Sequence, residues 1–308
     1  MSAEQPFELR FAKPSLRMRL MEWIIAKRGS DFGDAQAIRA SVPIRKPPRD
    51  APMPGRFNAR FQVEHWEAEG QAVVTLHPKA GRGEWHIIYW HGGGFFLPMF
   101  KEHWPLVAAM AEHTGASISV PLYNVVPEHD YHPANKQADA VYEKVAAEWG
   151  DDKIALSGDS AGGNMALSLA LQRRDAGKSL PAKLIPFAPW LDMGLRDPAA
   201  RAINDVDVML DVDSIILLGR WWAGNRGTDH PYASPLFADL AGLPPIAIFQ
   251  GRHDLFVIDS RTFTAKARAA GVPAQLYEYE GSPHVYMALT FTREARDTFA
   301  VVKAFLDA

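Results

Sequence analysis

Short apolar runs alternate with longer segments of helical periodicity through most of this chain. The apolar runs are rich in β-branched and aromatic residues and occupy residues 85–90, 116–120, 153–158, 183–187 and 245–251. Apolar positions recur at helical spacing in residues 104–113, 133–149, 163–177 and 260–270. Strands that are apolar on both faces and alternate with helices are typical of a parallel sheet covered by helices on both sides. The pattern therefore predicts an α/β fold with a mostly parallel central sheet.

Partial alternation of apolar and polar positions, with short apolar runs, marks one further region. Residues 60–68 and 72–78 alternate in this way on either side of Gly70. Alternation of this kind is the signature of a half-buried strand. We therefore expect an antiparallel pair of strands at one edge of the sheet.

An amphipathic helix is predicted near the N-terminus. Leu16, Leu20, Trp23 and Ile24 recur at helical spacing among arginine and lysine residues. We expect this helix to dock on the protein's own core or pocket, and a helix lying on a membrane surface is the alternative interpretation.

Two segments stand apart from the α/β pattern. Residues 1–55 comprise the predicted helix and a proline-rich connector, and residues 56–308 form the main domain. Within that domain, residues 196–229 contain no convincing strand. Long excursions between strands commonly carry a lid or a binding wall. We expect residues 1–55 and 196–229 to pack together as a helical cap.

Composition excludes several classes of protein. The chain has 308 residues, a formal net charge of −3 and no cysteine. The small acidic charge argues against binding nucleic acid through phosphate contacts, and the missing thiols exclude a disulfide scaffold and a cysteine nucleophile. No uncharged run near the N-terminus is long enough for a signal peptide or a stable membrane anchor. We therefore expect a cytoplasmic protein.

The candidate nucleophile is Ser160, in the sequence Gly-Asp-Ser-Ala-Gly at residues 158–162. A predicted strand precedes this pentapeptide and a predicted helix follows it. A serine on a sharp turn between strand and helix has its hydroxyl exposed above the sheet, and small neighbours prevent collisions. The context therefore favours a nucleophilic serine over ordinary helix capping.

A serine nucleophile needs a base and an acid to orient that base. His284 lies in a glycine- and proline-containing loop after a strand-like run, where active sites of such sheets gather, so it is the candidate base. His230 and His253 have weaker contexts. Asp254 follows the predicted strand 245–251 and is the candidate acid. Asp259 is the fallback acid, although we expect it to cap the next helix.

Three consecutive glycines follow the predicted strand 85–90 and His91. Glycine lets a backbone approach a reacting group closely with its amide hydrogens exposed. We expect the amides of Gly93, Gly94 and Ala161 to form an oxyanion hole. His91 is expected to brace the loop by hydrogen bonding and not to transfer protons.

Aromatic residues near these motifs could contact a substrate. Phe95 and Phe96 follow the glycines directly, and Trp222 lies in the excursion 196–229, so these three are the candidate substrate contacts. The acidic run 204–213 lacks the glycine and glutamate of a calcium-binding loop. Helix capping by Asp211 or Asp213 is the expected role there, and no metal site is predicted.

The chain resembles the hormone-sensitive-lipase branch of the α/β-hydrolases. The matching sequences are HGGGF (91–95), YNVVPEH (123–129), GDSAGG (158–163), ASPL (233–236), GRHDLF (251–256) and SPHVY (282–286). The resemblance implies the α/β-hydrolase fold with a helical cap. It also implies that the protein acts as a serine carboxylesterase and needs no cofactor. The chain departs from the branch at Asn124, Val125, Val126, Leu255, Val285 and Tyr286, and none of these departures removes a catalytic group.

The expected activity is hydrolysis of short- to medium-chain acyl esters through an acyl-enzyme intermediate. The partner is then a small-molecule ester, and relatives suggest a monomer or homodimer. Hydrolysis of lactones or amides by the same residues is one alternative. A small-molecule receptor on the hydrolase scaffold is another, and the presence of both Ser160 and His284 disfavours it.

Overall fold

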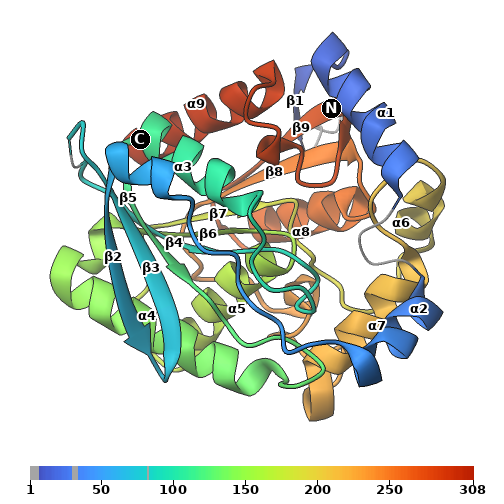
Figure 1. The fold of residues 1–308 in the computed structure, drawn as a ribbon, viewed down its shortest axis with the longest axis horizontal. Coiled ribbons are helices and arrows are strands. Elements are labelled where there is room, and N and C mark those ends of the chain that lie inside the picture. The colour runs from blue at the N-terminus through green and yellow to red at the C-terminus, as the bar shows by residue number, and fades with distance from the viewer. Residues whose placement is uncertain (1–6, 30–33, 82) are drawn as a thin grey trace.

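A single mixed sheet forms the centre of the molecule (Figure 1). The computed structural model describes residues 7–29, 34–81 and 83–308. Within these residues the strand order is β1-β9-β8-β7-β6-β4-β5-β3-β2. The strands are β1 (Glu8–Phe11), β2 (Phe61–Ala68), β3 (Gln71–Pro78), β4 (His86–Trp90), β5 (Ser117–Pro121), β6 (Ile154–Asp159), β7 (Lys183–Phe187), β8 (Ile246–His253) and β9 (Ala274–Pro283).

Most neighbouring strands run parallel. The exceptions are β2, which pairs antiparallel with β3, and β3, which pairs antiparallel with β5. The parallel pairs from β5 through β9 require crossover connections, and the helices between these strands provide them. The predicted α/β class and the predicted antiparallel pair at the sheet edge are both confirmed.

Helices cover both faces of the sheet. They are α1 (Leu16–Arg28), α2 (Ala35–Ser41), α3 (His103–Thr114), α4 (Tyr131–Trp149), α5 (Ala161–Asp175), α6 (Pro198–Ala202), α7 (Val212–Ala223), α8 (Val257–Ala269) and α9 (Arg293–Asp307). Apolar residues of α3 and α9 pack on one face, and those of α4, α5 and α8 pack on the other.

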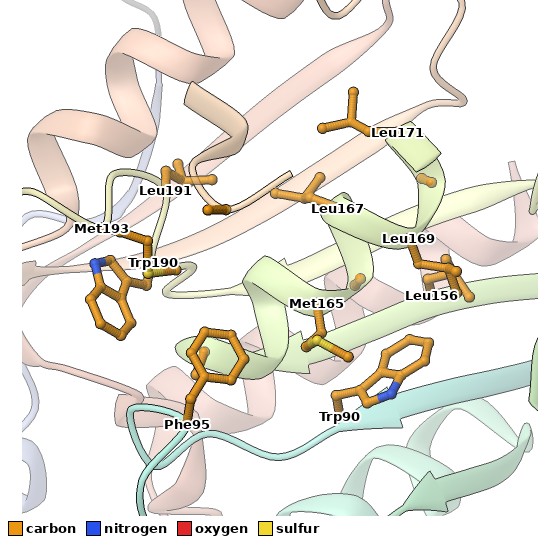
Figure 2. Packing of buried hydrophobic residues seen from close by; sticks show 14 of the residues in the cluster. Trp90, Phe95, Leu156, Met165, Leu167, Leu169, Leu171, Trp190, Leu191 and Met193 are labelled. Atoms are coloured by element: carbon orange, nitrogen blue, oxygen red, sulfur yellow. The ribbon is translucent and has the colours of Figure 1, made fainter. Parts of the chain in front are cut away.

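Strand β4 shows why helices must cover both faces of the sheet. Ile87 and Tyr89 belong to the core under α3 and α9, whereas Ile88 and Trp90 belong to the core under α4 and α5. Side chains alternate between faces along a strand, so an uninterrupted apolar run supplies both cores at once. Figure 2 shows part of the second core, in which Trp90 and Met165 lie near the start of α5.

The N-terminal segment differs in part from its predicted helical structure. Residues 8–11 form β1, which pairs parallel with β9 at the far edge of the sheet. Arg10 fixes this strand by donating through Nε to Asp297 of α9 over 2.9 Å. Helix α1 then begins after Ser15, whose hydroxyl accepts from the Met18 amide over 3.1 Å. The predicted helix is therefore present, but a strand precedes it.

The two segments expected to form a cap do contact one another. Helix α2, from the N-terminal segment, packs against α7, from the excursion 196–229, and Figure 1 shows the two side by side. Asp211 caps α7 by accepting from the Ser214 amide over 2.9 Å, which confirms the predicted capping role.

Candidate active site

Ser160 occupies a strained turn between β6 and α5. Its backbone dihedral angles are φ 55° and ψ −116°, a combination that non-glycine residues rarely adopt. The Ser160 amide donates to the Phe187 carbonyl over 2.8 Å and holds the turn in place. A Cβ atom at Gly162 would lie 1.9 Å from the Trp90 carbonyl oxygen, so the turn requires glycine there. This is the geometry expected of an exposed nucleophile.

Asp254 and His284 form a buried pair at the ends of β8 and β9. The Nδ1 atom of His284 lies 2.8 Å from Oδ2 of Asp254. Two further donors hold the carboxylate, namely Gln250 Nε2 at 2.6 Å and the Phe256 amide at 2.9 Å. The predicted acid and base are therefore in direct contact, and the imidazole is fixed in orientation.

Burial and nearby carboxylates shift the pKa of His284 in opposite directions. Burial, the largest single cause, lowers the pKa of the imidazole, but the charge and hydrogen bond of Asp254, with the charges of Asp207 and Asp159, together outweigh burial. The net pKa of His284 is raised above its usual value of 6.5. The pair therefore favours accepting a proton at the imidazole.

One cavity of about 540 Å³ has both Ser160 and His284 in its wall. Among the hydrogen bonds of the described residues, there is none between Ser160 Oγ and His284 Nε2. Such bonds often form only when substrate is present. The cavity is mostly apolar, with walls that include Met21, Ile25, Leu97, Met209, Leu210 and Leu289.

The glycine loop contributes Gly93 to the same cavity. Gly93 and Gly94 have φ angles of 111° and 62°, which L-residues with a Cβ rarely adopt. Their amides donate no hydrogen bond within the described ranges, and Gly94 and Ala161 are buried. Free amides next to Ser160 are the donors that an oxyanion hole requires.

His91 is held as a neutral side chain behind this loop. Its Nδ1 lies 2.6 Å from the Gly92 carbonyl oxygen, and its ring stacks on Tyr123 with centroids 4.3 Å apart. Burial, with a smaller effect of His103, lowers the pKa of His91 to about 3. A neutral imidazole bonded to the loop fits the expected bracing role.

A second histidine–aspartate pair lies in the cavity wall and was not predicted. His103 Nε2 is 3.6 Å from Oδ2 of Asp159, the residue just before Ser160. The other oxygen, Oδ1, accepts from the Gly92 amide at 3.0 Å and the Tyr89 hydroxyl at 2.5 Å. Asp159 therefore ties the glycine loop to the serine turn. The signal in the sequence was a carboxylate inside an otherwise buried strand, which requires partners.

Asp207, in the excursion 196–229, is a further unpredicted residue of the site. Its carboxylate accepts from the amides of Met209 at 2.8 Å, Leu210 at 2.9 Å and Leu255 at 2.8 Å. Burial and the nearby charge of Asp254 raise the pKa of Asp207 to about 6. This residue connects the cavity wall to the loop that carries the candidate acid.

Asp259 has neither of the roles predicted for it. Helix α8 begins at Val257, three residues earlier than expected, so Asp259 falls inside the first turn and caps nothing. Its side chain is buried, and neither carboxylate oxygen has a hydrogen-bond partner in the described part of the chain. Because His284 is bonded to Asp254, the fallback acid is not needed.

The three candidate substrate contacts lie in the core and not in the cavity wall. Phe95 and Trp222 stack with ring centroids 3.7 Å apart and planes 1° apart, and both are fully buried. Phe96 is also buried and lies under the Arg45 guanidinium, 4.3 Å from its ring centroid. Phe95 and Trp222 attach the excursion to the glycine loop, and contact of the three rings with a substrate stays a prediction.

Neither a metal site nor a membrane span is found in the described ranges. No group of three or more histidine and acidic residues there is arranged to hold a metal ion. No helix there combines the length and hydropathy that a membrane crossing requires.

Several relatives align with about two thirds to three quarters of the chain. A triacylglycerol lipase of Mycobacterium tuberculosis is 29% identical over 74% of this chain and 48% of its own length. An acetyl-hydrolase of Streptomyces hygroscopicus is 30% identical over 65% of this chain and 67% of its own length. An esterase of Acinetobacter venetianus is 32% identical over 63% of this chain and 65% of its own length. The chain therefore spans about half of the first relative and about two thirds of the other two.

Solved structures match over almost the whole chain. The esterase EstE5 soaked with p-nitrophenyl butyrate has a TM-score of 0.81 and 26% identity, covering 95% of this chain and 98% of its own. A hormone-sensitive lipase from a metagenome library shares the fold, with a TM-score of 0.81 and 24% identity over 96% and 98% of the two chains. The sequence profile of the alpha/beta hydrolase fold matches residues 87–288. Because this match covers well over half of the sequence, the chain belongs to the α/β-hydrolase family.

Proposed function

We propose that this protein is a serine carboxylesterase that hydrolyses short- to medium-chain acyl esters through an acyl-enzyme intermediate. The observation that carries the proposal is the placement of Ser160 and His284 in the wall of one apolar cavity, with His284 held by the buried Asp254. The names of the relatives, which include an acetyl-hydrolase and an esterase, support the same class of reaction.

The first half-reaction acylates the serine. Ser160 Oγ attacks the carbonyl carbon of the ester while His284 Nε2 takes its proton. Asp254 keeps the other ring nitrogen protonated and stabilises the positive imidazolium. His284 then gives its proton to the departing alcohol as the tetrahedral intermediate collapses.

Negative charge on the carbonyl oxygen is stabilised by the amides of Gly93, Gly94 and Ala161. Each well-placed donor of this kind contributes about 3–4 kcal/mol to lowering the barrier. In the second half-reaction, water takes the place of the alcohol, His284 again acts as the base, and the acid is released. The reaction requires neutral His284, so activity is lost as the pH falls below the raised pKa of this residue.

The cavity favours acyl chains of limited length. Its volume of about 540 Å³ is within the range for small-molecule sites, and its walls are mostly apolar. Met21 and Ile25 from residues 1–55, with Met209 and Leu210 from residues 196–229, line one side of it. We assign these segments as the cap over a catalytic domain of residues 56–308. The enzyme needs no cofactor and works in the cytoplasm as a monomer or homodimer.

A rapid-mixing experiment with p-nitrophenyl butyrate tests the proposal. The wild type should release a burst of p-nitrophenol close to the enzyme concentration, followed by slower steady turnover. Ser160→Ala should remove the burst and lower kcat by roughly four orders of magnitude or more. Ser157→Ala, which alters a buried serine on the same strand bonded to the Ile185 carbonyl, is the matched control and should keep the burst.

Turnover that survives in Ser160→Ala would refute the assignment. A parallel panel of acetyl, butyryl and hexanoyl esters, a lactone and an anilide compares the competing substrate classes. Higher kcat/KM on the lactone or the anilide than on every ester would replace the carboxylesterase proposal with lactone or amide hydrolysis.

A further inference from the structure

Helix α1 has two apolar faces. The inner face is formed by Met18, which is fully buried, and by Met21 and Ile25, which line the cavity. The opposite face is formed by four residues at helical spacing that remain largely exposed to solvent. Their exposed fractions are 81% for Leu16, 55% for Leu20, 59% for Trp23 and 41% for Ile24.

This exposed row is unlike the scattered apolar residues of an ordinary surface. Single exposed apolar side chains need no explanation, but a contiguous set marks an interaction site. Phe291 extends the set, since it is 47% exposed and its carbonyl accepts from Arg17 Nη1 over 3.2 Å. We call Leu16, Leu20, Trp23, Ile24 and Phe291 the outer face.

The charges around the outer face are of one sign. Four cationic residues on α1 or just before it flank this face, namely Lys13, Arg17, Arg19 and Lys27, and all are exposed. The acidic residue of the helix, Glu22, is turned inward and hydrogen-bonds His253. The chain as a whole carries a net charge of −3, so this concentration of positive charge is local.

An apolar row with a tryptophan and flanking cations fits the surface of an anionic lipid bilayer. The apolar side chains would enter the boundary of the acyl chains, and the arginine and lysine side chains would reach the phosphate groups. A second copy of this chain fits less well, because a two-fold contact between outer faces would bring the same cations together.

We propose that the outer face of α1 binds reversibly to anionic lipid surfaces. The inner face of the same helix is a wall of the cavity, so binding would hold the cavity next to the lipid. The proposed esterase would then take its substrates from the lipid surface as well as from solution. The binding step itself does not depend on the proposed hydrolytic activity.

Vesicle flotation with the full-length chain tests the proposal. Wild type should float with vesicles of phosphatidylglycerol and phosphatidylcholine, and less with phosphatidylcholine alone. Leu20→Ser combined with Trp23→Ser should weaken partitioning by roughly tenfold or more. Neither residue lines the cavity, so hydrolysis of a water-soluble ester without vesicles should stay within about twofold of wild type.

Two variants serve as controls. Ile44→Ser alters an apolar side chain that is 83% exposed away from α1 and should bind vesicles as wild type does. Ser160→Ala should also bind as wild type, which separates lipid binding from the proposed catalysis.

Three outcomes would overturn the proposal. In the first outcome, the wild-type protein does not float with vesicles of either composition. Another is a double variant that binds as well as wild type. The third is a wild-type dimer in sizing experiments that the double variant converts to a monomer, which would assign the outer face to a second copy.

Discussion

Three buried aspartates, Asp159, Asp254 and Asp259, differ in their hydrogen-bond partners. Asp254 has an imidazole and two donors. Asp159 has a tyrosine hydroxyl, an amide and a nearby histidine; burial raises its pKa, but these partners outweigh burial and the net pKa is lowered. Asp259 has no partner among the described residues, and burial with the charges of Asp192 and Asp197 raises its pKa to about 7. Residues of a single type thus differ in pKa according to burial and hydrogen-bond partners.

Asp259→Asn should stabilise the protein at alkaline pH. The folded-state pKa of about 7 lies above the usual aspartate pKa of 3.8, so the folded protein keeps a proton that the unfolded chain releases between these pH values. The free energy of unfolding of wild type therefore falls as the pH rises through this window. Asparagine cannot ionise, so the variant should gain on the order of 1–3 kcal/mol at pH 8 relative to wild type, and much less near pH 4.

Urea unfolding at these two pH values measures the difference. Asp239→Asn, which changes an exposed carboxylate, is the control and should show no such pH dependence. An equal effect of Asp259→Asn at both pH values would mean that Asp259 is not protonated in the folded protein near neutral pH.

At the scale of elements, sequence patterns predicted the strands and turns whose formation depends on neighbouring residues in the chain. The strand runs and the Gly-Asp-Ser-Ala-Gly turn were predicted because each depends on residues close together in sequence. Strand β1 was missed because it is four residues long and its partner β9 lies more than 260 positions away. The start of α8 was misplaced because no side chain caps it, and the Val257 amide instead donates to the Asp254 carbonyl. The stacking of Phe95 on Trp222 was not predicted for a related reason, since it depends on how the excursion packs.

Asp207 joins the excursion 196–229 to the loop after β8, although almost fifty residues separate Asp207 from Leu255 in the sequence. It holds Met209 and Leu210 in the cavity wall and binds the amide of Leu255, beside the candidate acid. Asp207→Asn should lower the pKa of His284, because the charge of Asp207 is one of the causes that raise it. The acid limb of the kcat/KM profile should therefore move to lower pH.

The full pH profile distinguishes this effect from simple loosening of the wall. Loosening alone would raise KM for hexanoyl esters without moving the acid limb. Asp205→Asn, two residues earlier and exposed, is the matched control and should leave the profile in place. An unmoved acid limb in Asp207→Asn would show that its charge does not act on His284.

At the scale of the whole molecule, the cavity lies where the sheet meets both cap segments. Its polar end comes from the sheet, through Ser160 after β6 and His284 after β9, and its apolar wall comes partly from α1 and the excursion. The sequence predicted the polar end through motifs. It could not predict which cap residues enter the cavity, because that depends on how α1 is held against α9, which Figure 1 shows at the same side of the molecule.

Glu294 of α9 attaches the start of α1 to α9. It is a fully buried residue at the start of α9, and its carboxylate accepts from the Ser15 amide at 2.6 Å and from the Ser15 hydroxyl at 2.9 Å. Ser15 is also the residue that caps α1. Glu294→Ala should therefore cost α1 about 1–3 kcal/mol of local stability. Because α1 lines the cavity but carries no reacting group, KM for butyryl esters should rise several-fold while kcat changes little.

Hydrogen exchange of residues 16–28 and steady-state kinetics together test this link between distant ends of the chain. Faster exchange in α1 should accompany the higher KM. Glu112→Ala, which breaks an exposed ion pair between α3 and Arg60, is the control and should change neither quantity. If exchange in α1 accelerates and KM stays the same, then α1 does not shape the binding site. If kcat falls as far as kcat/KM, the loss of Glu294 has reached the catalytic residues, and the division between a catalytic sheet and a binding cap would not hold.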